Sequence, residues 1–384
     1  MFRLSSMFFA TAFALAVTIA AVGQTTKSFT PVEGANLKAK IDNGIMQGKA
    51  SAPAGLFWVG YQFEVRPGVA IDFEIVSPDG TISFSNDGWS IMSDSRYETR
   101  ELGVFFLFEK ARDSFTRAEV YNLRRDHQFS SYPVYWAGKA TNEESLNYLK
   151  SIIDSNLPEV NRLADRAAYA IALHDDARVE GILTELVKRP AAAPIRNNAI
   201  YWLGFTPESQ SKNALLAEIV RSPNESSESR NQAMSALGMS RAATTLPLLE
   251  NLYETMTTRE LKRRALGGIA RSDNHDGAAT YLIQVAQNEK ELELRQSAIS
   301  GLGRIPGDKS LSFLSNTLDG SPELELQKQA VRAIGRRPKD EAIPILIRAA
   351  RNHPRIEVRK LAVQMLGQTR DERAIAVLGE LLAK

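Results

Sequence analysis

Apolar residues recur at helical spacing through the C-terminal part of the chain, where a nine-residue pattern repeats about every 32 residues. Six copies carry Ala at the fourth position and an aliphatic residue at the eighth, so both side chains lie on one face of a helix. Gly closes five of these copies, and a left-handed Gly is expected to end each helix. The copies occupy residues 196–204, 230–238, 262–270, 295–303, 327–335 and 359–367, with a degenerate copy at 166–174.

A second amphipathic segment lies between successive copies, for example at residues 340–350 and 371–382. Two helices per repeat cannot bury their apolar faces alone, whereas stacked pairs share a continuous core. The sequence therefore predicts an all-α solenoid of about seven helix pairs over residues 140–384. Thr141 and Glu144 have the spacing of a capping box and mark the start of its first helix.

Residues 24–139 show a different pattern, in which apolar and polar side chains alternate between short turn sequences. Residues 56–136 hold 17 of the 30 Phe, Trp and Tyr residues, whereas residues 160–384 hold seven. The predicted fold class is therefore α+β multidomain, with a small antiparallel β domain (24–139) followed by the solenoid (140–384). We expect strands at residues 55–63, 69–76, 104–108, 118–123 and 132–136, with turns at 77–80 and 86–88.

Residues 1–23 have the pattern of a secretory signal peptide. Arg3 precedes an apolar run from Met7 to Val22, and small residues stand before Gln24. The run is shorter than the roughly 20 apolar residues of a typical membrane-spanning helix, and retention as an uncleaved anchor is the alternative. We expect cleavage near Gly23, which leaves a mature chain that works in the periplasm or outside the cell.

The repeated pattern resembles HEAT-like repeats of the phycobilisome-lyase type over residues 143–384, about 60% of the chain. Residues 356–367 are especially similar to the second helix of that family. In the family, the Arg that opens this helix usually pairs with an acid nearby, and here Glu357 precedes Arg359. The aromatic β domain and the signal peptide also resemble exported bacterial HEAT-repeat proteins. These resemblances imply a HEAT-like α-solenoid.

Composition and motifs limit the kinds of reaction and binding site that this chain can support. The chain has no cysteine and a net charge of +2, which excludes thiol catalysis and a chain-wide attraction to nucleic acid. None of the four His residues precedes Glu, so the His–Glu pairs of HEAT-like hydroxylases are missing. His174 and His353 fall at helix ends, where capping or solvent exposure is expected. We assign aromatic residues such as Trp58 and Trp136 to the core, with sugar stacking as the alternative. We predict no catalytic residue, no metal site and no cofactor.

The concave face of the solenoid is the remaining candidate site, because the second helix of each HEAT-like pair generally lines it. Amides and basic groups predominate at the exposed positions of these helices, and no acid occurs among them. Residues 328–384 add a local excess of seven basic side chains. Amides and Arg side chains can bind a peptide backbone and its carboxylates. The candidate residues are Asn197, Tyr201, Gln232, Arg263, Gln296, Gln329, Arg332, Lys360 and Gln364.

These observations favour an exported, non-enzymatic scaffold that binds a protein or peptide of the cell envelope on this concave face. A solvated helix face without a ligand is the simpler interpretation of the same residues. An enzyme or enzyme subunit of the HEAT-like lyase or hydroxylase type is the alternative function. Binding of nucleic acid, as in HEAT-like DNA glycosylases, is less well supported because the chain carries an export signal and little net charge.

Overall fold

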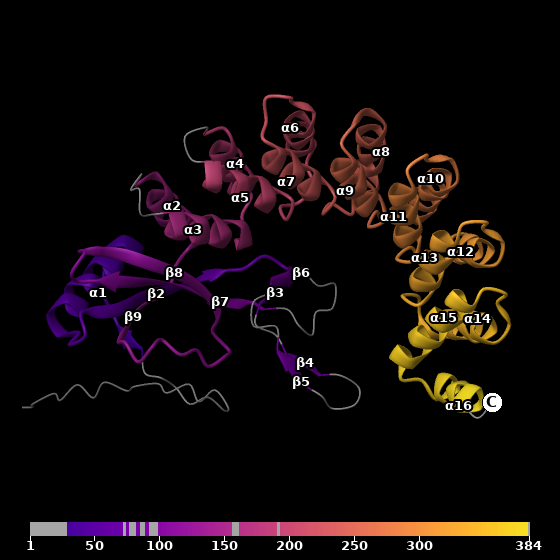
Figure 1. Ribbon diagram of the computed structural model, residues 1–384. Coiled ribbons are helices and arrows are strands. Elements are labelled where there is room, and N and C mark those ends of the chain that lie inside the picture. Colours follow the sequence, from indigo (N-terminus) through magenta and orange to yellow (C-terminus); the bar gives the residue numbers. More distant parts are fainter. Residues whose placement is uncertain are drawn as a thin grey trace, which may run out of the picture.

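The computed structural model describes residues 29–71, 74–76, 82–84, 89–91, 99–155, 161–189 and 193–382. A small sheet packs against one end of a curved double layer of helices (Figure 1). The predicted signal peptide and the two predicted turns, at 77–80 and 86–88, lie outside the described residues. No helix in the described ranges is long and apolar enough to cross a bilayer.

Among the described residues, five strands form the main sheet in the order β1-β9-β2-β7-β8. Strands β2, β7 and β8 are antiparallel neighbours, whereas β9 runs parallel to both β1 and β2. The sheet is therefore mixed, and alternation alone did not reveal this because it carries no information on strand direction. The strands are β1 (Thr30–Pro31), β2 (Leu56–Glu64), β7 (Glu101–Glu109), β8 (Ser114–Asn122) and β9 (Val134–Lys139). Two short antiparallel pairs precede β7: β3 (Val69–Ile71) with β6 (Trp89–Ile91), and β4 (Glu74–Val76) with β5 (Ile82–Phe84).

A helix that the sequence pattern did not predict, α1 (Leu37–Ser51), covers part of the sheet. Asn36 caps it by accepting a hydrogen bond from the Ala39 amide at 2.9 Å. Its buried stripe includes Gly44 and Gly48, so the apolar period is weak in the sequence. At Gly48 an added Cβ would lie 2.3 Å from the Phe57 ring, and Gly therefore permits close packing of α1 on β2.

Both faces of the central strands are buried, so β2 and β7 are apolar almost without interruption. Phe57 and Phe63 on β2 join the core shared with the helices, together with Phe106 on β7. On the opposite face, Trp58 and Phe105 form a separate aromatic cluster. The prediction that Trp58 belongs to the core is confirmed, since it is 2% exposed.

In the described residues from 142 onward, the solenoid has seven helix pairs followed by one further α-helix (Figure 1). The first helix of each pair lies in the outer layer: α2 (Asn142–Asp154), α4 (Arg178–Val187), α6 (Gln210–Arg221), α8 (Leu246–Thr255), α10 (His275–Asn288), α12 (Asp308–Gly320) and α14 (Lys339–Asn352). The second lies in the inner, concave layer: α3 (Asn161–Leu173), α5 (Ala193–Leu203), α7 (Ser227–Leu237), α9 (Arg259–Ile269), α11 (Leu292–Leu302), α13 (Leu324–Ile334) and α15 (Ile356–Thr369). The last helix is α16 (Glu372–Leu382), and the capping box of Thr141 and Glu144 opens α2 as predicted.

The repeated Gly has a different role from the predicted one. Gly238, Gly303 and Gly335 have right-handed backbone angles, with φ between −71° and −60°. An added Cβ at Gly303 would instead lie 2.7 Å from the Ala333 carbonyl oxygen in the next inner helix. The pattern therefore needs Gly for close approach of neighbouring helices rather than for a left-handed turn.

The Arg that opens the inner helix contacts a backbone carbonyl, and in two copies it also pairs with an acid as expected: Arg196 with Glu225 at 2.6 Å and Arg295 with Glu323 at 2.7 Å. Arg359 donates to the His353 carbonyl at 2.7 Å, and Arg230 donates through Nε to the Val220 carbonyl at 2.8 Å. In the second case the carbonyl lies in the last turn of an outer helix, where it lacks an intrahelical partner. The Arg side chain thus ties the outer helix, or the turn after it, to the inner helix. The expected pairing of Arg359 with Glu357 does not occur.

Candidate functional site

The sheet joins the solenoid through a buried polar connection. His174, which follows α3, is 2% exposed and stacks on Phe63 with ring centroids 4.3 Å apart. Its Nδ1 lies 2.7 Å from the Ala170 carbonyl oxygen, and its Nε2 lies 2.7 Å from Ser145 Oγ. Ser145 Oγ is in turn 3.0 Å from the hydroxyl of Tyr61 on β2. This His residue is therefore buried in the core and caps the end of α3 through the Ala170 carbonyl, so the expected capping role is confirmed and the alternative of solvent exposure was wrong.

His353 is buried as well, with 5% exposure. Its Nε2 lies 3.0 Å from the Leu318 carbonyl oxygen, while Nδ1 accepts from the Arg355 amide at 3.2 Å. It thus shapes the turn before α15, as a capping residue does, but it does not face solvent. Among the described residues, no group of three or more His, Asp and Glu side chains is placed to hold a metal ion.

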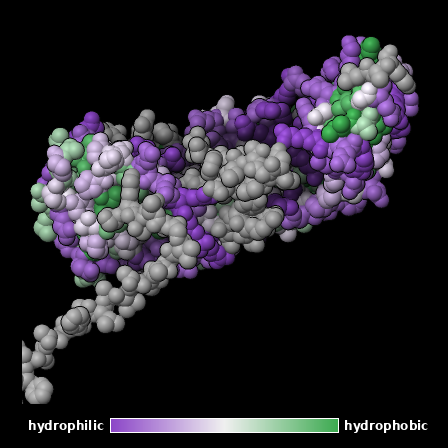
Figure 2. Space-filling model, turned by 90° about the horizontal axis from the view of Figure 1, so that it is seen from below, coloured by the Kyte–Doolittle hydropathy of each residue, from purple (hydrophilic) through white to green (hydrophobic). Residues whose placement is uncertain are grey.

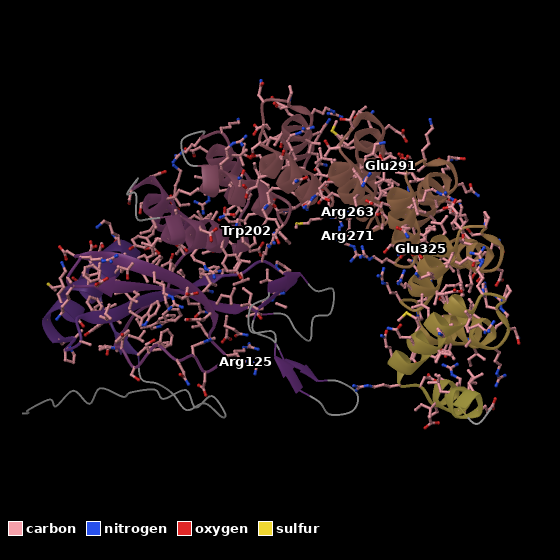
Figure 3. The ribbon with its side chains drawn as sticks, viewed as in Figure 1. Arg125, Trp202, Arg263, Arg271, Glu291 and Glu325 are labelled. Atoms are coloured by element: carbon pink, nitrogen blue, oxygen red, sulfur yellow. The ribbon has the colours of Figure 1, made fainter. Side chains whose placement is uncertain are left out.

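A hollow of about 470 Å³ lies on the concave face, at the centre of the solenoid. Four successive inner helices, α5, α7, α9 and α11, supply its walls together with the residues that follow them. Polar side chains dominate this lining, and none of its members is Asp or Glu. The lining residues are Tyr201, Gln232, Ser235, Gly238, Met239, Arg263, Arg264, Gly267, Arg271, Ser297, Ser300, Gly301 and Arg304. Figure 3 shows Arg263 and Arg271 on the concave side of the solenoid.

Two of the four arginines that line this hollow share one carboxylate. Arg263 Nη2 lies 2.7 Å from Glu260 Oε2, and Arg264 Nε lies 2.8 Å from Glu260 Oε1. Arg264 also donates to Ser235 Oγ in the preceding repeat at 2.6 Å. The sequence expectation of an acid-free face is therefore incomplete, because Glu260 reaches the rim from one turn earlier in α9.

The other two arginines have no carboxylate within ion-pair distance in the described part of the chain. Arg271 Nη1 donates to the Gly267 carbonyl at 3.0 Å and to the Gly238 carbonyl at 3.3 Å. Burial and then the charge of neighbouring Arg304 lower the pKa of Arg271. Backbone carbonyls thus hold the Arg271 guanidinium beside Arg304. A bound anion would therefore contact two positive charges that no carboxylate balances.

A second hollow of about 710 Å³ adjoins the first one. Arg271 and Arg304 line both hollows and therefore stand between them. Lys212 also lines the second hollow, but its Nζ donates to the carbonyls of Thr206 and Pro207 at 3.1 and 3.0 Å. Glu208 lines the second hollow as well, and its carboxylate lies 3.9 Å from Lys212 Nζ, so these two charges oppose each other and Arg271 and Arg304 carry the positive charge between the hollows.

All nine predicted residues lie on inner helices, and three of them line the first hollow: Tyr201, Gln232 and Arg263. Asn197 accepts a hydrogen bond from Ser229 Oγ at 2.7 Å and lines a different hollow at the edge of the solenoid. The structure leaves five predicted residues outside these hollows: Gln296, Gln329, Arg332, Lys360 and Gln364.

Sequence reasoning missed Arg271 and Arg304, the two charged residues that the hollows share. Each directly follows the ninth position of a repeat copy, and Arg336 occupies the same place in the next copy. The signal was therefore present as a tenth position that is Arg in three successive repeats. It was overlooked because this position lies just after the helix end, where a helical face does not predict the direction of a side chain.

Comparison with protein families gives one match, a model described as HEAT repeats, over residues 312–384. This part of the chain is therefore similar to HEAT repeats. Together with the helix pairs described above, the match confirms the predicted fold class, a small sheet followed by a HEAT-like solenoid. A comparison with curated protein sequences gives no significant match.

Several solved structures are similar to the HEAT-like region. Human deoxyhypusine hydroxylase in complex with glycerol is 15% identical, with 62% of this chain and 90% of that chain covered and a TM-score of 0.30. The CpcE–CpcF complex of phycocyanin lyase from Nostoc sp. PCC7120 is 19% identical, with coverage of 62% and 92% and a TM-score of 0.34. The YibA protein of Escherichia coli is 12% identical, with coverage of 63% and 89% and a TM-score of 0.35. Likeness at this level carries no argument about activity.

Proposed function

We propose that this protein is an exported, non-enzymatic scaffold that binds a protein or peptide of the cell envelope on the concave face of its HEAT-like solenoid. The observation that carries the proposal is the first hollow, to which four successive repeats contribute side chains. A ligand in such a hollow contacts several repeats at once, which is how a solenoid gains an extended binding surface. Figure 2, which views the molecule from below, shows mainly hydrophilic surface between the two ends wherever grey atoms do not cover it.

Site-specific crosslinking tests this binding face. A photoreactive residue at Gln232, in the hollow, is expected to give a discrete adduct with an envelope protein in living cells. The same residue at Asn251, on outer helix α8, is the matched control and should not give that adduct. The double variant Arg263→Glu/Arg304→Glu should lose the adduct while keeping its helical circular dichroism. An adduct that persists in this variant would contradict binding at the hollow.

Export is tested separately by the mass of the protein recovered outside the cytoplasm. We expect a mature chain that begins at Gln24, because small residues precede this position as they do at signal-peptidase sites. Recovery of the full-length chain in the membrane fraction would favour the uncleaved anchor. Recovery in the cytoplasm would contradict export. The alternative that this protein is an enzyme is supported by the resemblance to HEAT-like lyases and hydroxylases. Stoichiometric iron in the purified mature chain would favour that alternative.

A further inference from the structure

We propose that the concave hollow recognises an extended acidic peptide segment whose carboxylates are spaced to match the repeat, with Arg271 and Arg304 as the main anchors. This inference rests on the proposed function and specifies the chemistry of its ligand. It starts from the tenth position of the repeat, where Arg271, Arg304 and Arg336 stand at the same place in three consecutive copies.

These three arginines form a ladder across neighbouring inner helices. Arg271 and Arg304 line the same two hollows. Arg336 belongs to the next repeat and reaches back, donating from Nη1 to Ser300 Oγ in the lining at 2.7 Å. One guanidinium therefore follows another at the period of the helix stack, along the direction in which an extended ligand would cross the helices.

The charge of this ladder is not balanced within the hollow. Glu260 pairs with Arg263 and Arg264, at the α9 wall. No Asp or Glu lines the first hollow, and no described carboxylate lies within ion-pair distance of Arg271 or Arg304. Arg binds carboxylates through two parallel N–H donors, so a carboxylate from a ligand would supply the missing partner.

The remaining lining favours a peptide as the carrier of these carboxylates. Ser235, Ser297 and Gln232 offer neutral donors and acceptors, which fit the amide groups of a peptide backbone. A volume of about 470 Å³ lies within the range of sites that hold small ligands, so it accommodates a segment of a few residues. A nucleic acid would require many phosphate contacts over a broad basic surface, and the chain as a whole carries a net charge of only +2.

The repeat also sets the spacing of the carboxylates. Neighbouring packed helices lie about 8–10 Å apart. Three residues of a peptide in the extended polyproline II conformation span about 9 Å and bring the side chain back to the same side, because this conformation has three residues per turn and a rise of roughly 3.1 Å. Acidic residues at every third position therefore match successive arginines of the ladder, whereas adjacent acidic residues can reach only one of them.

The test uses the mature chain and two synthetic nine-residue peptides, each with a fluorescent label. One peptide has Glu at every third position and Ser or Gly elsewhere, and the other has the same composition with its three Glu residues consecutive. We expect the spaced peptide to bind more tightly by roughly tenfold, which corresponds to one additional charge-assisted contact. Fluorescence anisotropy at a fixed salt concentration measures both dissociation constants.

Three single variants locate the binding. Arg271→Gln and Arg304→Gln should each weaken the spaced peptide roughly tenfold, because each removes one of the anchors. Arg348→Gln is the matched control, since it makes the same charge change on outer helix α14, where Arg348 pairs with Asp319 at 2.8 Å. It should leave binding unchanged, and circular dichroism should show that all three variants fold.

Equal binding of the two peptides, or an equal loss in Arg348→Gln, would overturn the proposal, because either outcome indicates unspecific charge attraction. Stronger competition by an oligothymidine than by the spaced peptide would overturn it in favour of nucleic acid. If neither peptide binds while the Gln232 crosslink persists, the acidic ligand is wrong and the interaction scaffold stands. If the crosslink is also absent, both proposals fail.

Discussion

His174 shows how one buried side chain couples the fold to pH. Desolvation lowers the pKa of His174 from its ordinary 6.5 to about 4, against smaller opposing effects of the Ala170 carbonyl and the Asp176 carboxylate. The charge of Arg178 acts in the same direction as burial. The folded protein therefore keeps this imidazole neutral, with Nδ1 2.7 Å from the Ala170 carbonyl oxygen and Nε2 2.7 Å from Ser145 Oγ.

This shift predicts destabilisation by acid. Between pH 6.5 and about 4, the unfolded chain binds a proton at His174 that the folded chain does not, so the free energy of unfolding falls as the pH falls. The slope from this one group is up to about 1.4 kcal/mol per pH unit. His174→Gln should be less stable at pH 7, and its difference from the wild type should shrink through this window.

Chemical denaturation at several pH values measures the effect, with His275→Gln as the control. His275 is exposed at the first turn of α10, so its replacement should leave the pH dependence as it is in the wild type. A pH dependence of His174→Gln that parallels the wild type would show that another group is responsible.

The inner helices approach each other through small residues at two fixed positions of the repeat. The ninth residue of one copy meets the seventh residue of the next, as in Gly204 with Ala236 and Gly238 with Gly268. At Gly335 the opposing residue is Met365, and at Gly367 no atom lies within 4 Å of an added Cβ. The same Gly is thus tightly packed at the centre of the solenoid and unconstrained near its C-terminal end.

Two equivalent substitutions should therefore have opposite effects on stability. Gly303→Ala places a methyl group against the backbone of α13, and overpacking of this kind costs about 1–3 kcal/mol. Gly367→Ala lies inside α15 in open space and should stabilise the protein by up to about 1 kcal/mol through helix propensity. Thermal unfolding of both variants provides the comparison. A destabilised Gly367→Ala would contradict this account of the pattern.

At the scale of the whole molecule, one main hydrophobic core of the described residues runs from Val32 beside the sheet to Ala374 in the last helix. Helix α3 packs on β8, and backbone hydrogen bonds join Arg66 to Leu173 and Asp175 to Glu64. The predicted boundary near residue 140 falls between β9 and α2, within this packed region. Division into two domains stays a prediction, since packing is continuous across the boundary.

Deletion of residues 29–140 should destabilise the repeats unequally. The faces of α2 and α3 that the sheet covers would become exposed, whereas each later repeat contacts only its neighbours. Hydrogen exchange should accelerate strongly in α3 and remain unchanged in α13. Deletion of α16 is the complementary control, with acceleration in α15 and no change in α3. A uniform acceleration along the solenoid in either variant would show that the molecule unfolds as one unit.

Local pattern was sufficient for much of the fold. The repeat of Ala, an aliphatic residue and Gly predicted the helix pairs, because amphipathic helices of fixed period have one stable way to bury their faces. The capping box placed the start of α2, since Thr141 and Glu144 act within a single turn. The sequence pattern did not predict helix α1, because Gly44 and Gly48 interrupt the apolar residues on its buried side.

The repeat architecture and the lack of thiol chemistry could be predicted from the amino-acid sequence, because they follow from periodicity and composition. The inner position of the candidate residues was implied by the resemblance to HEAT-like repeats. Three features became visible in the folded molecule: β9 runs parallel to β2, His174 is buried, and Arg271 and Arg304 lie together between two hollows. Each of these features depends on residues from different repeats or strands. Their proximity is created by packing, and no local pattern encodes it.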